Sequence, residues 1–336
     1  MLDRRILLTT SAAGAATLVV PSPAEAAPRP GKVLARGLQI PWGLAFLPNG
    51  DALVTEREGD VHRVRRRGGR RRIGSVATPG GGEGGLLGAA LHPAFKRNRW
   101  VYFYVTTAND NRVVRRRFVG GQLEGRQVVL GGIPKGQIHD GGRIAFGPDG
   151  LLYVATGDTG NGELAQRRGS LAGKILRMTP RGGVPSGNPF GTLVWSYGHR
   201  NVQGLDWDRR GRLWATELGQ STRDELNRIR PGRNYGWPDV EGGDGSGPYA
   251  DPFVTWSPTS SCSPSGLAIA KGHAWVGALA GESLYSVRLT GRNAGRKRRH
   301  LHGRFGRIRT VQQAPDGSLW ITTSNGSNDK VIRIRL

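Results

Sequence analysis

A short phrase that recurs along the chain constrains the fold more than any other feature. Each copy begins with a small residue and an apolar run, passes through a turn such as Pro-Asp-Gly, and ends in a second apolar run that leads to Thr, Gly or a carboxylate. The copies lie at 43–56, 85–107, 142–158, 204–217, 266–279 and 310–323. Two short apolar runs around a Gly-containing turn predict a β-hairpin. Their spacing is close to the roughly 40–50 residues of a propeller blade, so we expect an all-β, six-bladed β-propeller.

The first 26 residues have the pattern of a secretory signal peptide. Arg4-Arg5 precede an apolar run over residues 6–20, and Ala24-Glu25-Ala26 has the form of a cleavage site. The paired arginines fit the twin-arginine export route and also the basic region of a general secretory signal. We therefore expect a secreted or periplasmic protein whose residues 33–336 form one propeller domain. We expect no integral membrane segment after signal removal, because no later apolar run approaches the length of a spanning helix.

The chain is strongly basic, with 49 Lys and Arg residues against 25 Asp and Glu and a net charge of +24. Outside clusters at 63–72 and 292–299 the arginines are spread along the chain, and no nucleic-acid-binding motif accompanies them. We expect a solvated basic surface that attracts anionic ligands, and no nucleic-acid partner. Cys262 is the single cysteine, so no intramolecular disulfide is expected.

Polar residues collect at one phase of the repeat. In propellers the first strand of each hairpin lies nearest the axis, so the residues before it surround the mouth of the channel. These residues are Pro41-Trp42, Glu83, Gln137 to Asp140, His199-Arg200-Asn201, Ser263-Pro264-Ser265 and Arg307-Ile308-Arg309. The second strand returns to the same end, and its exit residues include Glu56, Asp158, Glu217 and Ser324-Asn325. The opposite end receives ordinary turns, so we expect a ligand site at the polar end.

The chemistry of these residues leaves alternatives open. His139, which is followed by Gly141-Gly142, has the character of a base with space beside it, although a histidine before a strand is often a structural hydrogen-bonding residue. Arg200, Arg307 and Arg309 at one mouth favour an anionic ligand over free surface charges. The loop from Glu217 to Asn227 offers carboxylate, amide and carbonyl oxygens suited to calcium, and a solvated acidic loop fits the same sequence.

Several motifs in one order resemble the soluble quinoprotein glucose and aldose sugar dehydrogenases. They are I-H-D-G-G-R-I-A-F-G-P-D-G-L-L-Y-V-A-T-G-D, Y-G-H-R-N-V-Q-G, T-E-L-G-Q with D-E-L-N, R-N-Y-G-W-P and G-R-I-R. The resemblance covers residues 33–336. It implies a six-bladed propeller that holds pyrroloquinoline quinone (PQQ) and Ca²⁺, and an enzyme that oxidises the anomeric hydroxyl of an aldose to a lactone and passes the electrons to an unknown acceptor.

The resemblance also implies roles for individual residues. His139 matches the general base, while Arg200 and Asn201 match residues that contact the quinone oxygens. Arg307 and Arg309 match a pair that binds the cofactor's carboxylates. The remaining matches are Glu83 and Tyr235 beside the cofactor, and Glu217, Gly219, Gln220 and Asn227 in the calcium-loop region.

Two positions depart from the family pattern. Ala280 stands where a basic residue is common in the fifth repeat, and Ile138 stands where some glucose enzymes have an acidic residue before the base. The sequence therefore leaves two other readings open. One is a propeller that binds a sugar or a protein without turnover, and the other is a calcium-dependent lactonase.

Overall fold

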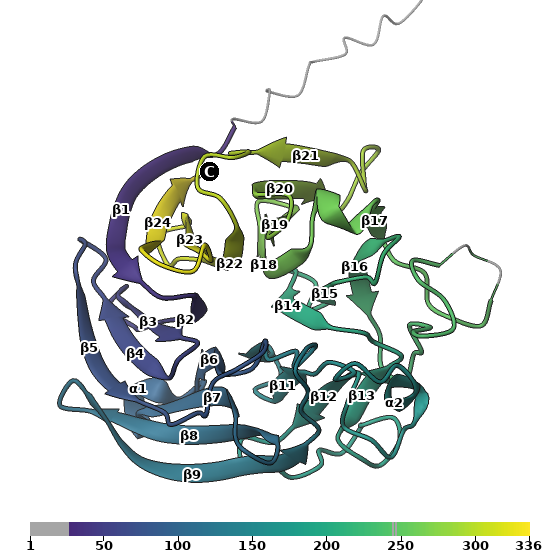
Figure 1. Cartoon of the computed structure of the whole chain (residues 1–336), viewed down its shortest axis with the longest axis horizontal. Helices are drawn as coiled ribbons and strands as arrows, with labels where there is room; N and C mark the ends of the chain where they lie inside the picture. Colours follow the sequence, from purple (N-terminus) through teal and green to yellow (C-terminus); the bar gives the residue numbers. More distant parts are fainter. Residues whose placement is uncertain (1–26, 244, 246) are drawn as a thin grey trace, which may run out of the picture.

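The computed structural model describes residues 27–243, 245 and 247–336. The signal peptide predicted at residues 1–26 lies outside the described residues. Six sheets, each of four antiparallel strands, surround a central axis (Figure 1). Besides these strands the described residues form the short helices α1 (Phe95–Asn98) and α2 (Glu163–Gln166) and the 3-10 helix η1 (Thr259–Ser261). The predicted all-β, six-bladed propeller is confirmed.

The first five blades each follow the chain order from the axis outward. Blade 1 contains β2 (Pro41–Phe46), β3 (Ala52–Glu56), β4 (Asp60–Val64) and β5 (Arg70–Ser75). Blade 2 contains β6 (Leu86–Leu91), β7 (Trp100–Thr106), β8 (Asn111–Val119) and β9 (Gln122–Ile133). Blade 3 contains β10 (Ile144–Phe146), β11 (Leu152–Ala155), β12 (Lys174–Met178) and β13 (Val194–Tyr197).

Blades 4 and 5 repeat this arrangement, and blade 6 closes the ring. Blade 4 contains β14 (Val202–Trp207), β15 (Leu213–Glu217), β16 (Asp224–Ile229) and β17 (Val254–Trp256). Blade 5 contains β18 (Pro264–Ala270), β19 (His273–Ala278), β20 (Ser283–Arg288) and β21 (Lys297–His300). Blade 6 contains β22 (Ile308–Gln313), β23 (Leu319–Thr323), β24 (Asp329–Arg335) and, from the N-terminal side of the chain, β1 (Arg29–Leu38).

The glycines of the repeat allow the inner strands of neighbouring blades to approach one another. A Cβ on Gly43 would lie 2.6 Å from the Leu87 carbonyl oxygen, and a Cβ on Gly204 would lie 2.5 Å from the Ser265 carbonyl oxygen. Gly266 stands in the same relation to the Arg309 carbonyl oxygen, at 2.6 Å. Real Cβ atoms do not tolerate such distances, so the packing of adjacent blades requires glycine at this position of the repeat.

Threonines on the second strand of a blade join the same contacts between neighbouring blades. The Thr55 hydroxyl donates to the Leu87 carbonyl at 2.6 Å, and the Thr216 hydroxyl donates to the Ser265 carbonyl at 2.6 Å. Each bond runs from the second strand of one blade to the inner strand of the next and satisfies a buried carbonyl. Apolar side chains fill the rest of the space between the sheets.

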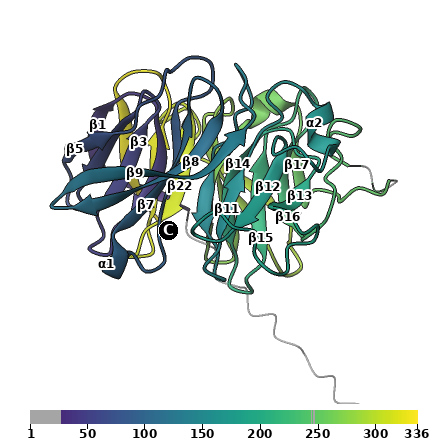
Figure 2. The same cartoon turned by 90° about the horizontal axis from the view of Figure 1, so that it is seen from below.

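The two ends of the propeller differ, as the repeat predicts. Figure 2 shows the ring from the side, with α1 near one face and α2 near the other. Helix α1 lies in the turn between the first two strands of blade 2, and α2 follows the second strand of blade 3. The loops on the α2 side hold the polar residues described next. No helix among the described residues combines the length and apolar character that crossing a membrane requires.

Candidate active site

A pocket of about 630 Å³ opens on the α2 face, where blades 3 and 4 meet. It is lined by residues that precede β10 and β14, residues that follow β11 and β15, and the loop between β16 and β17. The side chains used below are His139, Asp158, Arg200, Gln220, Trp237 and Glu241. His139, Arg200 and Gln220, which are far apart in the sequence, thus share one pocket.

His139 is held in a fixed orientation by its backbone and by a carboxylate. Its φ of 57° lies in the left-handed region, and its amide donates to Glu83 Oε2 at 2.8 Å. Nδ1 lies 2.7 Å from Asp158 Oδ1. Because a carboxylate only accepts hydrogen bonds, Nδ1 carries the proton and Nε2 of the neutral ring has a free lone pair. This tautomer is the one that a general base requires.

Asp158 connects the histidine to the opposite wall of the pocket. Its Oδ2 accepts from Trp237 Nε1 at 2.8 Å, and its Oδ1 also accepts from the Gly160 amide at 2.8 Å. Burial would raise the pKa of Asp158, but the hydrogen bonds from His139, Gly160 and Trp237 lower it below its ordinary value. Asp158 is therefore held as a carboxylate.

Arg200 and Asn201 bring unpaired donors to the same seam. Arg200 Nη1 donates to the Leu218 carbonyl at 3.2 Å, and its guanidinium carbon lies 5.5 Å from the centre of the Trp237 ring. Burial lowers the pKa of Arg200, while Asp158 and Glu217 oppose that shift. Arg200 Nε and Asn201 Nδ2 are buried without a hydrogen-bond partner among the described residues. Arg200 lines the pocket and Asn201 follows it in the chain, so these two orphaned donors are a chemical fit for a ligand with acceptor oxygens, such as a quinone.

A cavity of about 10 Å³, which shares Arg200, Trp237 and Glu241 with the lining of this pocket, adjoins Glu217, Gly219 and Glu225. That volume is about the size of a single water molecule or ion. Burial, followed by the charge of Glu217, raises the pKa of Glu225. Hard carboxylate and backbone oxygens around such a volume fit Ca²⁺.

The predicted calcium-loop residues have different surroundings. Glu217 accepts from His199 Nδ1 at 2.8 Å and from the Arg200 amide. Asn227 Nδ2 donates to Glu225 Oε2 at 2.8 Å, and Asn227 Oδ1 is buried without a partner among the described residues. Gln220 lines the larger pocket instead of the small cavity. The structure thus places Glu217 and Gly219 against the cavity, whereas Asn227 is outside its lining and contacts Glu225.

Tyr235 and Glu83 occupy supporting positions. The Tyr235 hydroxyl donates to the Arg228 carbonyl at 2.7 Å, and its ring stacks on His199 with a centroid separation of 4.7 Å. Tyr235 lines the small cavity and not the larger pocket. Glu83 is exposed and fixes the His139 amide.

Arg307 and Arg309 lie on blade 6, outside the residues that line the larger pocket. Arg307 is exposed, and Arg309 is buried at the inner strand β22. The charge of Glu83 acts on both Arg200 and Arg309, opposing the lowering of their pKa values by burial. Of the predicted anion-binding arginines only Arg200 lines the pocket itself.

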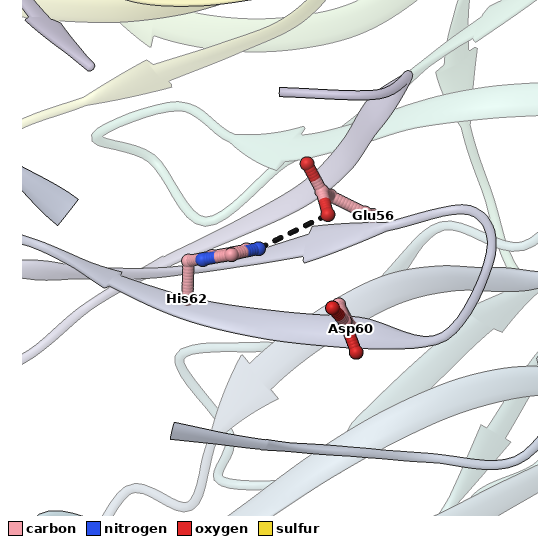
Figure 3. A group of neighbouring side chains, drawn as sticks. All are labelled: Glu56, Asp60 and His62. Carbon is pink, nitrogen blue, oxygen red and sulfur yellow. Dashed lines mark hydrogen bonds and ion pairs between the residues drawn. The ribbon is translucent and has the colours of Figure 1, made fainter. Parts of the chain in front are cut away.

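A second group of possible metal ligands lies on blade 1. Ligand atoms of Glu56, Asp60 and His62 all lie within 4.8 Å of one another (Figure 3). His62 Nε2 is 3.0 Å from Glu56 Oε2, however, and Arg72 Nε pairs with Asp60 Oδ1 at 2.7 Å. Arg70 Nη1 approaches His62 Nδ1 at 3.5 Å, which places a donor where a metal-bound imidazole would carry its own N–H. We interpret this group as an ion-pair network.

An oriented base and unpaired donors for acceptor oxygens thus lie next to an ion-sized cavity in a six-bladed propeller, an arrangement that suits an enzyme with an oxygen-rich ligand. The model of the glucose/sorbosone dehydrogenase family matches residues 38–333. The chain belongs to this family and is a sugar dehydrogenase.

Individual relatives agree with this assignment. The PQQ-bound form of aldose sugar dehydrogenase from Streptomyces coelicolor is 46% identical with a TM-score of 0.88, over 93% of this chain and 99% of that one. Aldose sugar dehydrogenase YliI from Escherichia coli is 30% identical over 89% of this chain and 91% of its own length. Quinoprotein glucose dehydrogenase B from Acinetobacter calcoaceticus is 31% identical over 70% of this chain and 58% of its own length.

Asp158, Trp237 and Glu241 line the pocket but were not among the predicted site residues. Asp158 was recognised as an exit residue of its repeat, but nothing in the sequence paired it with His139. Trp237 lies in the long segment between β16 and β17, outside the repeat. The R-N-Y-G-W-P motif contains Trp237 and could have indicated it, but the prediction chose Tyr235 from that motif.

Proposed function

We propose that this protein is an exported aldose dehydrogenase that uses PQQ and Ca²⁺ and oxidises the anomeric hydroxyl of its substrate to a lactone. The observation that carries the proposal is the His139–Asp158 pair beside the buried, unpaired donors of Arg200 and Asn201. The family assignment and the PQQ-bound S. coelicolor relative support the choice of cofactor. The signal-like residues 1–26 are the basis for proposing export.

His139 acts as the base in this proposal. Its Nε2 takes the proton of the anomeric hydroxyl as the C1–H bond breaks and the C1–O bond becomes a carbonyl. The hydrogen leaves C1 with its electron pair, and bound PQQ supplies the two-electron acceptor for it. Asp158 stabilises the imidazolium that forms, because its carboxylate faces the protonated Nδ1 at 2.7 Å.

The remaining residues bind and orient. Arg200 and Asn201 would donate to the quinone oxygens from Nε and Nδ2, the two atoms without partners among the described residues. Arg307 and Arg309 would provide positive charge for the cofactor's carboxylates. Ca²⁺ would be held at the cavity beside Glu217 and Gly219, where it would withdraw electron density from the cofactor as a Lewis acid.

The test is reconstitution of the purified protein with PQQ and Ca²⁺, followed by dye reduction with a panel of aldoses. The proposal predicts turnover that requires both additions and a lactone product from a sugar with a free anomeric hydroxyl. Binding of PQQ or sugar without dye reduction would favour a non-catalytic propeller, for which Ala280 was the motivating departure. Hydrolysis of added lactones with Ca²⁺ alone would instead favour a lactonase.

A further inference from the structure

A second pocket lies at the end of the propeller opposite the candidate active site. It has a volume of about 460 Å³ and is lined by residues of blades 6 and 1. Blade 1 contributes its β2–β3 and β4–β5 turns, and blade 6 contributes its β22–β23 turn with side chains of β23 and β24. The β2–β3 and β22–β23 turns are equivalent to the turn of blade 2 that contains α1, so the pocket is on the α1 face (Figure 2).

Two arginines of this pocket have guanidinium groups that are free to bind a ligand. Arg66 and Arg67 lie in the turn between β4 and β5, and both are exposed. Among the described residues neither guanidinium has a hydrogen-bond or ion-pair partner. The neighbouring carboxylate of Asp51 accepts from the Arg66 amide at 2.9 Å and pairs with Arg63 Nη2 at 2.6 Å. Asp51 therefore leaves the side-chain charges of Arg66 and Arg67 uncompensated.

The more buried part of the pocket comes from blade 6. Trp320 is 1% exposed, and the guanidinium carbon of Arg333 lies 5.9 Å from the centre of its ring. Arg333 Nη2 donates to the Arg66 carbonyl at 2.7 Å, and Nη1 is 3.9 Å from Asp316 Oδ2. Trp320 Nε1 and Arg333 Nε are buried without a hydrogen-bond partner among the described residues. Unpaired donors in a pocket fit a ligand with acceptor oxygens.

Charge and shape define the class of ligand. The lining contains three arginines and a single carboxylate, that of Asp316. Burial would raise the pKa of Asp316, but hydrogen bonds from Ser318 and the charge of Arg333 lower it below its ordinary value. One carboxylate compensates one arginine, so the pocket keeps a positive excess, and guanidinium groups bind carboxylate and phosphate oxygens well. The apolar part of the lining consists of Pro48, Ala314, Pro315 and Trp320.

We propose that this pocket binds a small organic anion with one carboxylate or phosphate group on a compact apolar body. Arg66 and Arg67 bind the anionic group from blade 1, Arg333 adds positive charge from blade 6, and the apolar body lies against the prolines. The volume is at the lower end of the range for small-molecule sites. Because the ligand contacts both blades at the closure of the ring, it stabilises the folded protein. The site does not depend on the proposed sugar oxidation.

Aromatic acids and a neutral analogue of similar shape test the site in solution. Apo-protein without PQQ is titrated at constant ionic strength with benzoate, phenyl phosphate or benzamide, and the melting temperature Tm is recorded. We expect about 10 mM of the preferred acid to raise Tm by about 2–5 °C, and benzamide to raise it by under about 1 °C. The acid with the larger effect identifies the preferred anionic group. No rise above that of benzamide with either acid would overturn the proposal.

Double variants matched in charge locate the response. Arg66→Met with Arg67→Met removes the two free guanidinium groups and should reduce the Tm rise to under about 1 °C. Arg65→Met with Arg71→Met removes the same charge from the same basic cluster, outside the residues that line the pocket, and should respond like the parent. All four side chains are exposed, so both variants are expected to fold. An equal Tm rise in the two double variants would contradict the proposed site.

Crystals soaked in 4-bromobenzoate give the position of the ligand. The anomalous peak of bromine should lie in the pocket between blades 6 and 1, and it should persist after PQQ and Ca²⁺ are added. A peak on the α2 face alone, lost on PQQ binding, would show that the acid occupies the proposed cofactor site and would overturn the inference. If the protein binds no PQQ or oxidises no sugar, the proposed function fails, and the peak still decides whether the second site exists.

Discussion

At the scale of single residues, the proposed chemistry depends on the bond between His139 Nδ1 and Asp158 Oδ1. That bond selects the ring tautomer whose Nε2 can accept a proton, and it places negative charge beside the imidazolium that forms. Trp237 Nε1 and the Gly160 amide donate the other hydrogen bonds to the Asp158 carboxylate. In the proposed mechanism Asp158 is therefore a positioning residue, and His139 is the catalytic residue.

Replacing Asp158 by Asn tests this division of roles. The amide keeps the size of the side chain but can donate to Nδ1, which favours the tautomer with the proton on Nε2. We expect kcat of the reconstituted enzyme to fall by about 10²–10⁴, with PQQ affinity within about threefold of the parent, measured by dye reduction and fluorescence titration. Asp149→Asn, at a turn on the opposite end, is the control. A kcat close to the parent value in Asp158→Asn would remove Asp158 from the mechanism.

At the scale of strands, buried and half-buried polar groups join neighbouring blades. Asp206 at the end of β14 accepts from the Ile269 amide of β18 at 2.6 Å and from the Trp207 amide at 2.8 Å. Burial raises the pKa of Asp206 from 3.8 to about 6, although these two bonds oppose the shift. Between those values the folded protein retains a proton that the unfolded chain has lost.

This difference makes the stability of the blade 4–5 seam depend on pH. Because the folded state binds more protons in this window, the free energy of unfolding contributed by Asp206 falls as pH rises from about 4 to 6, by up to about 3 kcal/mol. Urea unfolding of the parent and of Asp206→Asn from pH 4 to 7 measures it. We expect the stability of the parent relative to Asp206→Asn to decline through this window and then level off. A constant difference would show that Asp206 does not titrate there.

The repeat explains how much of the architecture was predictable. Glycine and threonine recur at fixed positions of the repeat because each is needed where neighbouring blades touch. Gly204 and Thr216 of blade 4 show this, since both contact the Ser265 carbonyl of blade 5. The same phase placed His139, Arg200 and Glu217 at one end. It gave no information on the loop between β16 and β17, so Trp237 was missed. It also gave no distances across the axis, so the contacts of Arg143 and Arg309 with the Trp42 ring could not be foreseen.

At the scale of the whole molecule, the ring is closed by β1, which pairs with β24 although the two lie at opposite ends of the sequence (Figure 1). Asp329 at the start of β24 is fully buried. It accepts from Thr323 Oγ1 at 2.6 Å, from the Asn325 amide at 2.7 Å and from the Ile40 amide at 3.2 Å. The last bond ties the segment between β1 and β2 to blade 6.

Asp329→Ala should therefore weaken the closure of the ring. Several buried donors lose a charged acceptor, and we expect the free energy of unfolding to drop by about 2–4 kcal/mol, measured by urea unfolding and tryptophan fluorescence. Asp316→Ala, which removes a more exposed turn carboxylate, should cost under about 1 kcal/mol. Similar losses in the two variants would mean that Asp329 has no special part in closure.

The most direct measurement of the central claim is anaerobic reduction of bound PQQ by an aldose, followed by absorbance in the parent and in His139→Gln. This single turnover requires no external acceptor, so it isolates proton and hydride transfer from reoxidation. The account predicts rapid reduction in the parent and a rate about 10²–10⁴ lower in the variant, with PQQ binding and the far-UV circular dichroism spectrum unchanged. Reduction of PQQ by His139→Gln at the parent rate would contradict it.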